Sequence, residues 1–320
     1  MSSIRIKNTL DRVAVCSRSF SRHPLLRRTI LSKFDQVKFN DDGLSLNGDS
    51  LVEFLFGADL AITALETIDD YILSNLPQLK RISKYGVGLD MIDMQAMRRY
   101  GKQLAWKGGV NRRSVAELTL TMMLSIIRKI PESQSQISSG VWKQTVGNTL
   151  SEKVIGIIGC GNIGRDLVAL LKPFNCRVLV NDIQDYQDFY RCNDLEARTL
   201  ESLLINSDIV TLHVPLDETT KNIISKERLS LMKSNSILIN TARGGLIDEN
   251  ALAFALKERK IGGAGLDVFE VEPPFENELL SCSKVFPTAH IGGSAEEAII
   301  AMGIAAIDGL DNSCEHLLVG

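Results

Sequence analysis

The segment Val154-Ile155-Gly156-Ile157-Ile158-Gly159-Cys160-Gly161-Asn162-Ile163-Gly164 decides the fold of this 320-residue chain. An apolar, β-branched run leads directly into Gly-x-Gly-x-x-Gly, and a helical pattern follows over 165–171. A second strand pattern over 176–180 then leads to Asp182. This order of strand, turn, helix and strand predicts a unit that binds a dinucleotide.

Each glycine of the turn has a separate physical task. Gly159 permits the tight turn, Gly161 lets the backbone approach a pyrophosphate, and Gly164 lets the helix pack closely on the strand. The helix then offers free N–H groups to the phosphates, at Asn162 and Ile163. The alternative is a glycine-rich turn without a ligand, and the surrounding strands and helix argue against it.

The acid that follows the second strand indicates which dinucleotide binds. Asp182 lies about 20 residues beyond the last glycine, where a carboxylate accepts from the ribose 2′-OH. Because a carboxylate repels a 2′-phosphate, the sequence predicts NAD rather than NADP.

Length and composition restrict the class of protein. A chain of 320 residues favours two domains, and 44% hydrophobic with 23% charged residues is typical of a soluble globular protein. A net charge of −3 argues against nucleic acid or an anionic membrane as a partner. No apolar run approaches the roughly 18 residues of a spanning helix, and residues 1–10 contain no secretory apolar region. The six cysteines show neither a C-x-x-C pair nor zinc-ligand spacing, so we expect a cytoplasmic chain without a metal site.

The first third of the chain has an α/β pattern of its own. Strand patterns over 12–16, 58–63 and 79–83 alternate with helical patterns over 21–33 and 69–76. A glycine-containing turn, 84–90, follows the third strand, at the kind of sheet edge where ligands bind in open α/β sheets. A plain connecting turn is an equally good interpretation.

A long helix is predicted from Arg113 to Lys129, with Ser114 and Glu117 as a capping box and Pro131 ending it. Its apolar residues cover more than one face, which indicates burial between domains or between subunits. The stretch 132–151 is expected to be irregular. Beyond Asp182, helices and strands alternate as far as Thr288, and a helix over 294–310 closes the chain. Such alternation implies parallel sheets covered by helices on both faces.

Three further places combine polar residues with strand ends. Arg243 follows an apolar strand, and its guanidinium could bind a carboxylate with two hydrogen bonds. Asp267 and Glu272 belong to an acidic loop that ends in two prolines, and His290 follows the last strand. Taken singly, a lone histidine is more often a satisfied structural group, and a lone arginine is more often a surface cation.

Together these motifs resemble the D-isomer-specific 2-hydroxyacid dehydrogenase family, which includes phosphoglycerate, glycerate/hydroxypyruvate, D-lactate and formate dehydrogenases. The resemblance rests on the glycine turn 159–164, Asn240-Thr241-Ala242-Arg243-Gly244, the segment 265–273, and His290-Ile291-Gly292-Gly293. It also covers Gly86-Val87-Gly88 and Ser114-Val115-Ala116-Glu117, so it extends over nearly the whole chain.

The resemblance implies a catalytic set. His290 corresponds to the general acid that protonates the keto oxygen as hydride arrives, and Glu272 to the carboxylate that favours the imidazolium. Arg243 corresponds to the residue that holds the substrate carboxylate and polarises the carbonyl. The nicotinamide supplies the hydride, while these side chains supply orientation and charge.

The resemblance also assigns contacts to cofactor and substrate. Asp267 corresponds to the acid near the nicotinamide carboxamide, and the loops along the dinucleotide contain His213, Val214, Pro215, Thr241, Ala242, Gly292 and Gly293. The N–H groups of Val87 and Gly88 correspond to anchors for the substrate carboxylate. Tyr85 either shapes the substrate pocket or packs in the core.

Two arginines depart from the family pattern. Arg112 and Arg113 stand where relatives commonly carry small residues, and they could bind a phosphate or second carboxylate of the substrate. The alternative is a pair of solvated residues at a helix start.

The expected fold is therefore α/β, with two Rossmann-like doubly wound parallel-sheet domains, of which the first is discontinuous. Residues 1–108 with 293–320 would bind substrate, 109–292 would bind NAD, and the substrate would lie in the cleft between them. The long helix would contribute to a homodimer. The expected activity is NAD-dependent hydride transfer between nicotinamide and a 2-keto/2-hydroxy acid, with a phosphorylated acid such as 3-phosphoglycerate as one candidate substrate. The alternative is a non-enzymatic, dinucleotide-sensing protein of the corepressor kind.

Overall fold

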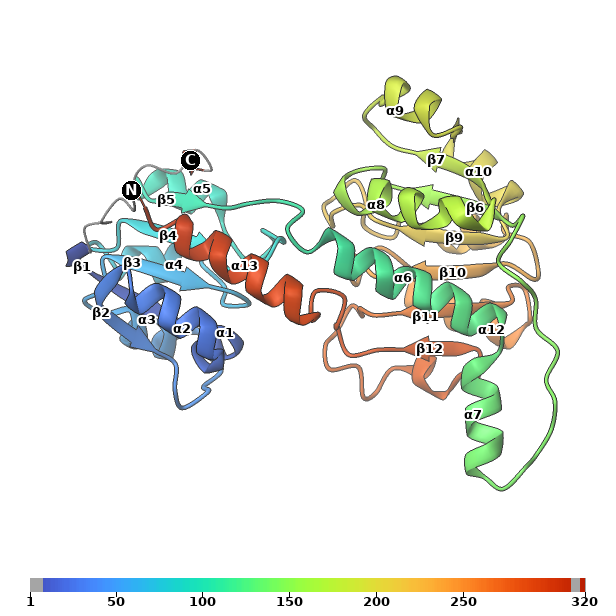
Figure 1. The fold of residues 1–320 in the computed structure, drawn as a ribbon, viewed down its shortest axis with the longest axis horizontal. Coiled ribbons are helices and arrows are strands. Elements are labelled where there is room, and N and C mark those ends of the chain that lie inside the picture. Colours follow the sequence, from blue (N-terminus) through green and yellow to red (C-terminus); the bar gives the residue numbers. More distant parts are fainter. Residues whose placement is uncertain (1–7, 312–316, 320) are drawn as a thin grey trace, which may run out of the picture. The chain divides into compact units, whose positions relative to one another are not determined.

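The computed structural model describes residues 8–311 and 317–319. The chain divides into two units, each with its own parallel sheet (Figure 1). Unit 1 comprises the described residues up to Asn111 and those from Ser294 onward, and unit 2 comprises Arg112–Gly293. The chain therefore leaves unit 1, completes unit 2, and then returns.

Unit 1 contains a sheet with the strand order β13-β5-β4-β3-β1-β2. Five of its strands are parallel, and β13 (Leu317–Val319) pairs antiparallel with β5. The parallel strands are β1 (Asn8–Val15), β2 (Phe34–Phe39), β3 (Leu60–Thr63), β4 (Arg81–Lys84) and β5 (Gln103–Ala105). Their order, 2-1-3-4-5, is a doubly wound order in which ligands bind beyond the carboxyl ends of the strands.

Helices give unit 1 two apolar cores. One core lies against α3 (Gly48–Leu55), α4 (Asp70–Ser74) and α5 (Met94–Arg99). The other lies against α1 (Arg18–Arg22), α2 (Pro24–Leu31) and α13 (Glu296–Asp308). The final helix therefore completes the core that begins with β1.

Unit 2 contains seven parallel strands in the order β12-β11-β10-β9-β6-β7-β8. These are β6 (Val154–Ile158), β7 (Arg177–Asn181), β8 (Glu196–Ala197), β9 (Ile209–Leu212), β10 (Ile237–Asn240), β11 (Gly263–Leu266) and β12 (Val285–Pro287). The order reverses at β6, which pairs with both β7 and β9, and the glycine turn follows β6 at this switch point. The expected fold class, with two doubly wound parallel sheets, is confirmed.

Unit 2 is covered by helices on both faces of the sheet (Figure 1). The helices of unit 2 are α6 (Arg112–Ile127), α7 (Ile130–Ser138), α8 (Asn162–Leu171), α9 (Gln187–Cys192), α10 (Leu200–Asn206), α11 (Lys226–Leu229) and α12 (Glu249–Lys257). Of these, α7 has no buried residue and projects away from the sheet (Figure 1). Short 3₁₀ turns cover Lys172–Phe174 and Glu278–Ser281. Within the described residues, none of the helices combines the length and apolar character needed to cross a bilayer.

The long helix differs from its prediction at both ends. It begins at Arg112, so Ser114 lies inside it and donates to the carbonyl of Gly292 (2.6 Å) rather than capping the helix. Pro131 does not end the pattern, because it occupies the first turn of α7, where a missing N–H costs nothing. Lys129, with φ of 56°, breaks the chain direction between α6 and α7. The prediction of irregular structure over 132–151 was therefore wrong for α7.

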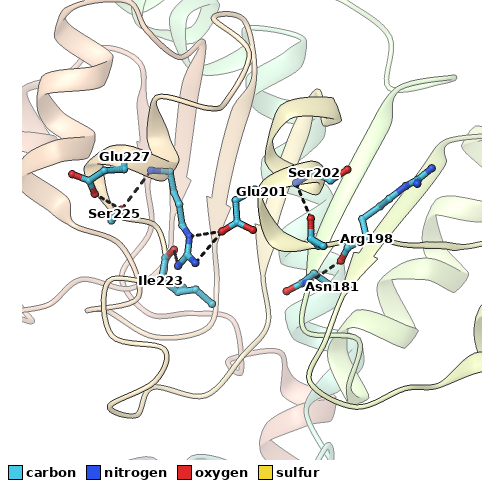
Figure 2. A network of polar contacts seen from close by, with 9 residues as sticks. Asn181, Arg198, Glu201, Ser202, Ile223, Ser225 and Glu227 are labelled. Atoms are coloured by element: carbon cyan, nitrogen blue, oxygen red, sulfur yellow. Dashed lines mark hydrogen bonds and ion pairs between the residues drawn. The ribbon is translucent and has the colours of Figure 1, made fainter.

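Side-chain caps fix the start of α10 and α11. The Glu201 carboxylate accepts from Arg228 Nη2 (3.1 Å), and Arg228 Nη1 donates to the carbonyl of Ile223. Figure 2 labels Glu201, Ile223 and Ser225 of this network. Ser225 and Thr199 accept from the first-turn N–H groups of the two helices. These exposed pairs set local geometry more than stability, because an exposed ion pair contributes only about 0–1 kcal/mol.

Candidate active site

The glycine turn after β6 has room for a ligand at one position and none at two others. A Cβ on Gly159, which has φ of 94°, would lie 2.6 Å from the carbonyl oxygen of His213, and one on Gly164 would lie 2.3 Å from that of Gly159. A Cβ on Gly161 would meet no described atom within 4 Å. Because α8 begins without a side-chain cap at Gly161, its first N–H groups face this open space. These residues fit the pyrophosphate of a dinucleotide.

Asp182 is joined to the glycine turn directly. Its Oδ2 accepts from the N–H of Cys160 (2.6 Å), and its Oδ1 accepts from the N–H of Gln184 (2.8 Å). The carboxylate predicted to bind the ribose therefore lies beside the predicted phosphate turn. Burial raises the pKa of the Cys160 thiol to about 11, so this residue packs as a neutral side chain.

Arg243 lies in a turn that is held from both sides. Buried Asn240 closes the turn, since its Oδ1 accepts from the N–H of Ala242 (3.0 Å) and its Nδ2 donates to the carbonyl of Arg243 (2.7 Å). A Cβ on Gly244 would lie 1.9 Å from the carbonyl oxygen of Phe269. The absence of a side chain there lets the Arg243 turn pack on the loop that leads to Glu272. In the sequence, Asn240 was named only as part of a motif, and its role in closing this turn was not predicted.

Thr241 and Ala242 are both buried, and Thr241 lies beside α6. The hydroxyl of Thr241 lies 2.8 Å from that of Thr119, which in turn donates to the carbonyl of Val115. This pair of hydroxyls ties the Arg243 turn to the long helix.

Asp267 anchors the segment that carries His290. Its carboxylate is 1% exposed and accepts from Thr288 Oγ1 (2.5 Å), Ile291 N–H (2.8 Å) and Gly292 N–H (2.8 Å), while its carbonyl accepts from the N–H of His290. These donors already engage both carboxylate oxygens. The sequence singled out Asp267 as an acid near the cofactor, but gave no sign that Thr288 and the backbone hold it.

His290 and Glu272 form a hydrogen-bonded pair. The imidazole Nδ1 lies 2.8 Å from Glu272 Oε2, and the other oxygen of Glu272 accepts from the N–H of Phe269 (3.1 Å). His290 has φ of 53°, in the left-handed region, and its side chain remains 45% exposed. With Nδ1 held, Nε2 is the ring nitrogen available to exchange a proton with a substrate.

The loop after β9 supports the glycine turn. The N–H of His213 donates to the carbonyl of Ile158, and a Cβ on Gly159 would meet Val214 at 2.9 Å. His213 Nε2 lies 3.1 Å from the hydroxyl of Thr211, and its Nδ1 has no partner among the described residues. Burial lowers the pKa of His213 to about 3, so the ring is neutral at physiological pH. Pro215 follows, and its carbonyl accepts from Thr220.

The predicted substrate residues of unit 1 follow β4. Tyr85 is buried and packs edge-on against Phe20, with 5.6 Å between the ring centroids. Val87 and Gly88 are partly exposed, and the carbonyl of Val87 accepts from Trp106. Tyr85 thus contributes to the core, whereas the two backbone positions remain accessible.

The two arginines at the start of α6 differ in their surroundings. Arg113 Nη2 forms an ion pair with Asp166 Oδ1 on α8 (2.8 Å). Arg112 is exposed, and no ion pair is found for it within the described residues. Gly292 is buried beside Asp267, and Gly293 is the last residue of unit 2.

The described residues hold no cluster of three metal-ligating side chains. Cys16, Cys160, Cys176, Cys192 and Cys282 are free thiols, and Cys314 lies outside the described residues.

Comparison with known proteins gives one family. Residues 120–292 match the model of the D-isomer specific 2-hydroxyacid dehydrogenase NAD binding domain. The chain is 35% identical over 279 residues to the glyoxylate reductase of Thermococcus litoralis, covering 84% of each protein. It is 38% identical over 262 residues to the D-3-phosphoglycerate dehydrogenase of Methanocaldococcus jannaschii, which covers 81% of this chain and 50% of that relative. The chain thus spans about half the length of that relative.

A solved structure agrees in fold. The apo D-lactate dehydrogenase from Escherichia coli is similar to this structure with a TM-score of 0.82 and 25% sequence identity. The match covers 96% of this chain and 100% of that chain.

Proposed function

The chain belongs to the D-isomer specific 2-hydroxyacid dehydrogenase family, and from that premise we propose that it transfers a hydride between nicotinamide and a 2-keto/2-hydroxy acid pair. Members of the family are NAD-dependent oxidoreductases that act on a CH–OH group. The cofactor is NAD, because the matched family model is that of an NAD binding domain. The observation that carries the proposal is the His290–Glu272 pair, with Nδ1 and Oε2 2.8 Å apart.

Reduction needs a proton at the carbonyl oxygen, and His290 is the residue proposed to give it. Glu272 accepts the hydrogen bond from Nδ1, so it fixes the orientation of the ring and directs Nε2 toward the substrate. In the reverse direction, Nε2 takes the proton from the substrate hydroxyl. Bound NAD supplies or accepts the hydride.

Arg243 is proposed to bind the substrate carboxylate and to stabilise the negative charge that develops on the oxygen. The N–H groups of Val87 and Gly88 are proposed as further donors to this carboxylate. On this assignment unit 1 is the substrate-binding domain and unit 2 the NAD-binding domain.

The substrate is proposed to carry a second negative group, as 3-phosphoglycerate does. Arg112 is the better candidate to bind that group, since Arg113 already pairs with Asp166. The Arg112→Ala variant should raise KM for phosphohydroxypyruvate about tenfold while changing KM for glyoxylate less than twofold, because one charged hydrogen bond is lost only with the phosphorylated acid. The Arg113→Ala variant is the matched control. Equal effects on both acids would remove the role of Arg112.

A cytoplasmic homodimer is proposed for the assembled protein. The free thiols of the described residues fit a reducing compartment. An apolar surface on α7 and the segment after it supports the dimer: α7 has no buried residue, and Ile130, Ile137, Val141, Trp142 and Val146 are exposed. Light scattering should give twice the chain mass, and the Ile137→Glu variant should shift the protein toward monomer. A monomeric parent protein would contradict the proposal.

The activity is tested by mixing the protein with NADH and, in turn, phosphohydroxypyruvate, hydroxypyruvate, glyoxylate, pyruvate and 2-oxoglutarate. Turnover of any of them, with NADH preferred to NADPH, supports the proposal. If the protein binds NADH but reduces none of these acids, the proposed activity is wrong and the dinucleotide-sensing alternative is favoured. Equal rates with NADPH would contradict the role of Asp182.

A further inference from the structure

The backbone after β4 carries three consecutive N–H groups for which the described residues provide no acceptor. Gly86 has φ of 128°, which only glycine adopts without strain. Within the described residues, no acceptor is found for the N–H groups of Gly86, Val87 and Gly88. Successive free N–H groups in a bent loop form a site for an anion. Such a site works only if the peptide planes are held in one orientation.

One of these planes is held by an indole. Trp106 Nε1 donates to the carbonyl oxygen of Val87 at 2.9 Å. The Val87–Gly88 peptide is trans and planar, so its C=O and N–H point in opposite directions. Because the indole fixes the carbonyl, it also fixes the N–H of Gly88, which points away from Trp106.

The indole itself is held in place. Trp106 follows β5 and packs against the apolar core that contains Leu104 and Ile92. A Cβ on Gly108 would lie 2.8 Å from Trp106 Cη2, so the chain must have a glycine there for the ring to keep its position. The segment Trp106-Lys107-Gly108 therefore forms a rigid support for the loop.

We propose that Trp106 is a positioning residue, which orients the Gly88 N–H to receive the carboxylate of the 2-keto acid. It acts through the Val87–Gly88 peptide and does not itself touch the substrate. Without the indole donor, this peptide is free to rotate, and the carboxylate loses a preset hydrogen bond. The inference rests on the proposed function, which places the substrate carboxylate at this loop.

The first test is kinetic. The Trp106→Phe variant retains an aromatic ring and removes the donor, and it should raise KM for glyoxylate about tenfold, the size of one positioned hydrogen bond. Changes in kcat and in KM for NADH should stay within about twofold. Tyr100→Phe is the matched control, because Tyr100 packs on the same core and its hydroxyl donates to Asp70 away from the loop. If Trp106→Phe and Tyr100→Phe behave alike, the inference is overturned.

A second variant and a binding measurement separate positioning from folding. Gly108→Ala keeps the indole N–H but displaces the ring, and it should reproduce the rise in KM. Calorimetric titration of the NADH-loaded protein with oxamate, an isostere of a 2-keto acid, should show the same loss of affinity in both variants and none in Tyr100→Phe. Unchanged oxamate affinity in Trp106→Phe would overturn the inference. If the parent protein turns over no keto acid and does not bind oxamate, the proposed function fails instead.

Discussion

Two acids orient His290, one through its side chain and one through its backbone. Glu272 binds its Nδ1, and the N–H of Phe269 in turn fixes Glu272. Farther back, Asp267 accepts from the N–H groups of Ile291 and Gly292, which follow His290 directly. The imidazole is thus oriented through its side chain and through its backbone by different acids.

Removal of the imidazole tests the proton-transfer role. His290→Ala should lower kcat for reduction by about 10²–10⁴-fold, the usual contribution of a general acid, with KM for NADH changed less than twofold. Glu272→Gln keeps the ring but replaces its carboxylate partner with a neutral amide, so it should lower kcat by a smaller factor. Steady-state kinetics with NADH titration measures both. A His290→Ala variant with more than a tenth of the parent kcat would contradict the assignment.

The proposed catalytic residues could be picked out of the sequence because each lies in a short motif near a strand end. The residues that hold these side chains in place could not be predicted from such motifs. Thr288 holds Asp267 across 21 residues of sequence, and Arg113 pairs with Asp166 across 53. Such contacts depend on which strand ends become neighbours, which no local pattern states.

Two glycine turns of unit 2 have different physical requirements. At Gly161 a side chain would enter open space, whereas at Gly244 it would overlap the backbone of Phe269 and Glu270. Gly161 therefore leaves open the space that we propose for the pyrophosphate, whereas Gly244 is required for the packing of one loop on another. A pair of alanine variants separates these requirements.

Gly161→Ala should melt within about 2 °C of the parent, because its φ of −78° and its surroundings accept a Cβ. Its KM for NADH should rise at least about tenfold, since the methyl group fills the position that the pyrophosphate approaches. Gly244→Ala should instead lower the melting temperature by several degrees, and kcat with it, because overpacking costs about 1–3 kcal/mol. Thermal melts and NADH kinetics on both variants test these two expectations. A stable Gly244→Ala variant would show that the two loops are not in contact as described.

Prediction of individual elements succeeded where burial was strong. Six of the seven strands of unit 2 were predicted, among them β6, β9 and β10, which are almost fully buried. The strand β8 was missed, because it has two residues, lies at the sheet edge and is not buried. Likewise, β2 was missed, since it lies at the edge of its sheet and most of its residues are partly or fully exposed. Helix α7 was missed because Pro131 also suits the first turn of a new helix.

Stability should depend on pH through His213, because desolvation lowers the pKa of its ring to about 3. Above pH 6.5 the ring is neutral in both the folded and the unfolded chain, so this contribution is fully present. Between pH 6.5 and 3 only the unfolded chain binds the proton. The free energy of unfolding should therefore fall by about 1.4 kcal/mol for each pH unit in that window, in addition to the effects of other groups.

Urea unfolding of the parent and of His213→Gln at several pH values isolates this contribution. The difference between the two proteins should be constant above pH 7 and should shrink steadily below pH 6, because glutamine does not titrate. Parallel curves over the entire range would show that His213 is accessible to protons in the folded state.

The return of the chain to unit 1 determines the order in which the ribosome can complete the two units. Every residue of Arg112–Gly293 is made before α13, whose Met302 and Ile307 complete the core around Phe20 and Leu26. Gly303 lets α13 lie directly on Leu26. During synthesis, unit 1 is therefore begun first and finished last. The apolar core residues that α13 covers stay exposed for most of elongation. Nascent chains halted before residue 294 should consequently bind chaperones through the N-terminal segment, with the central unit already folded.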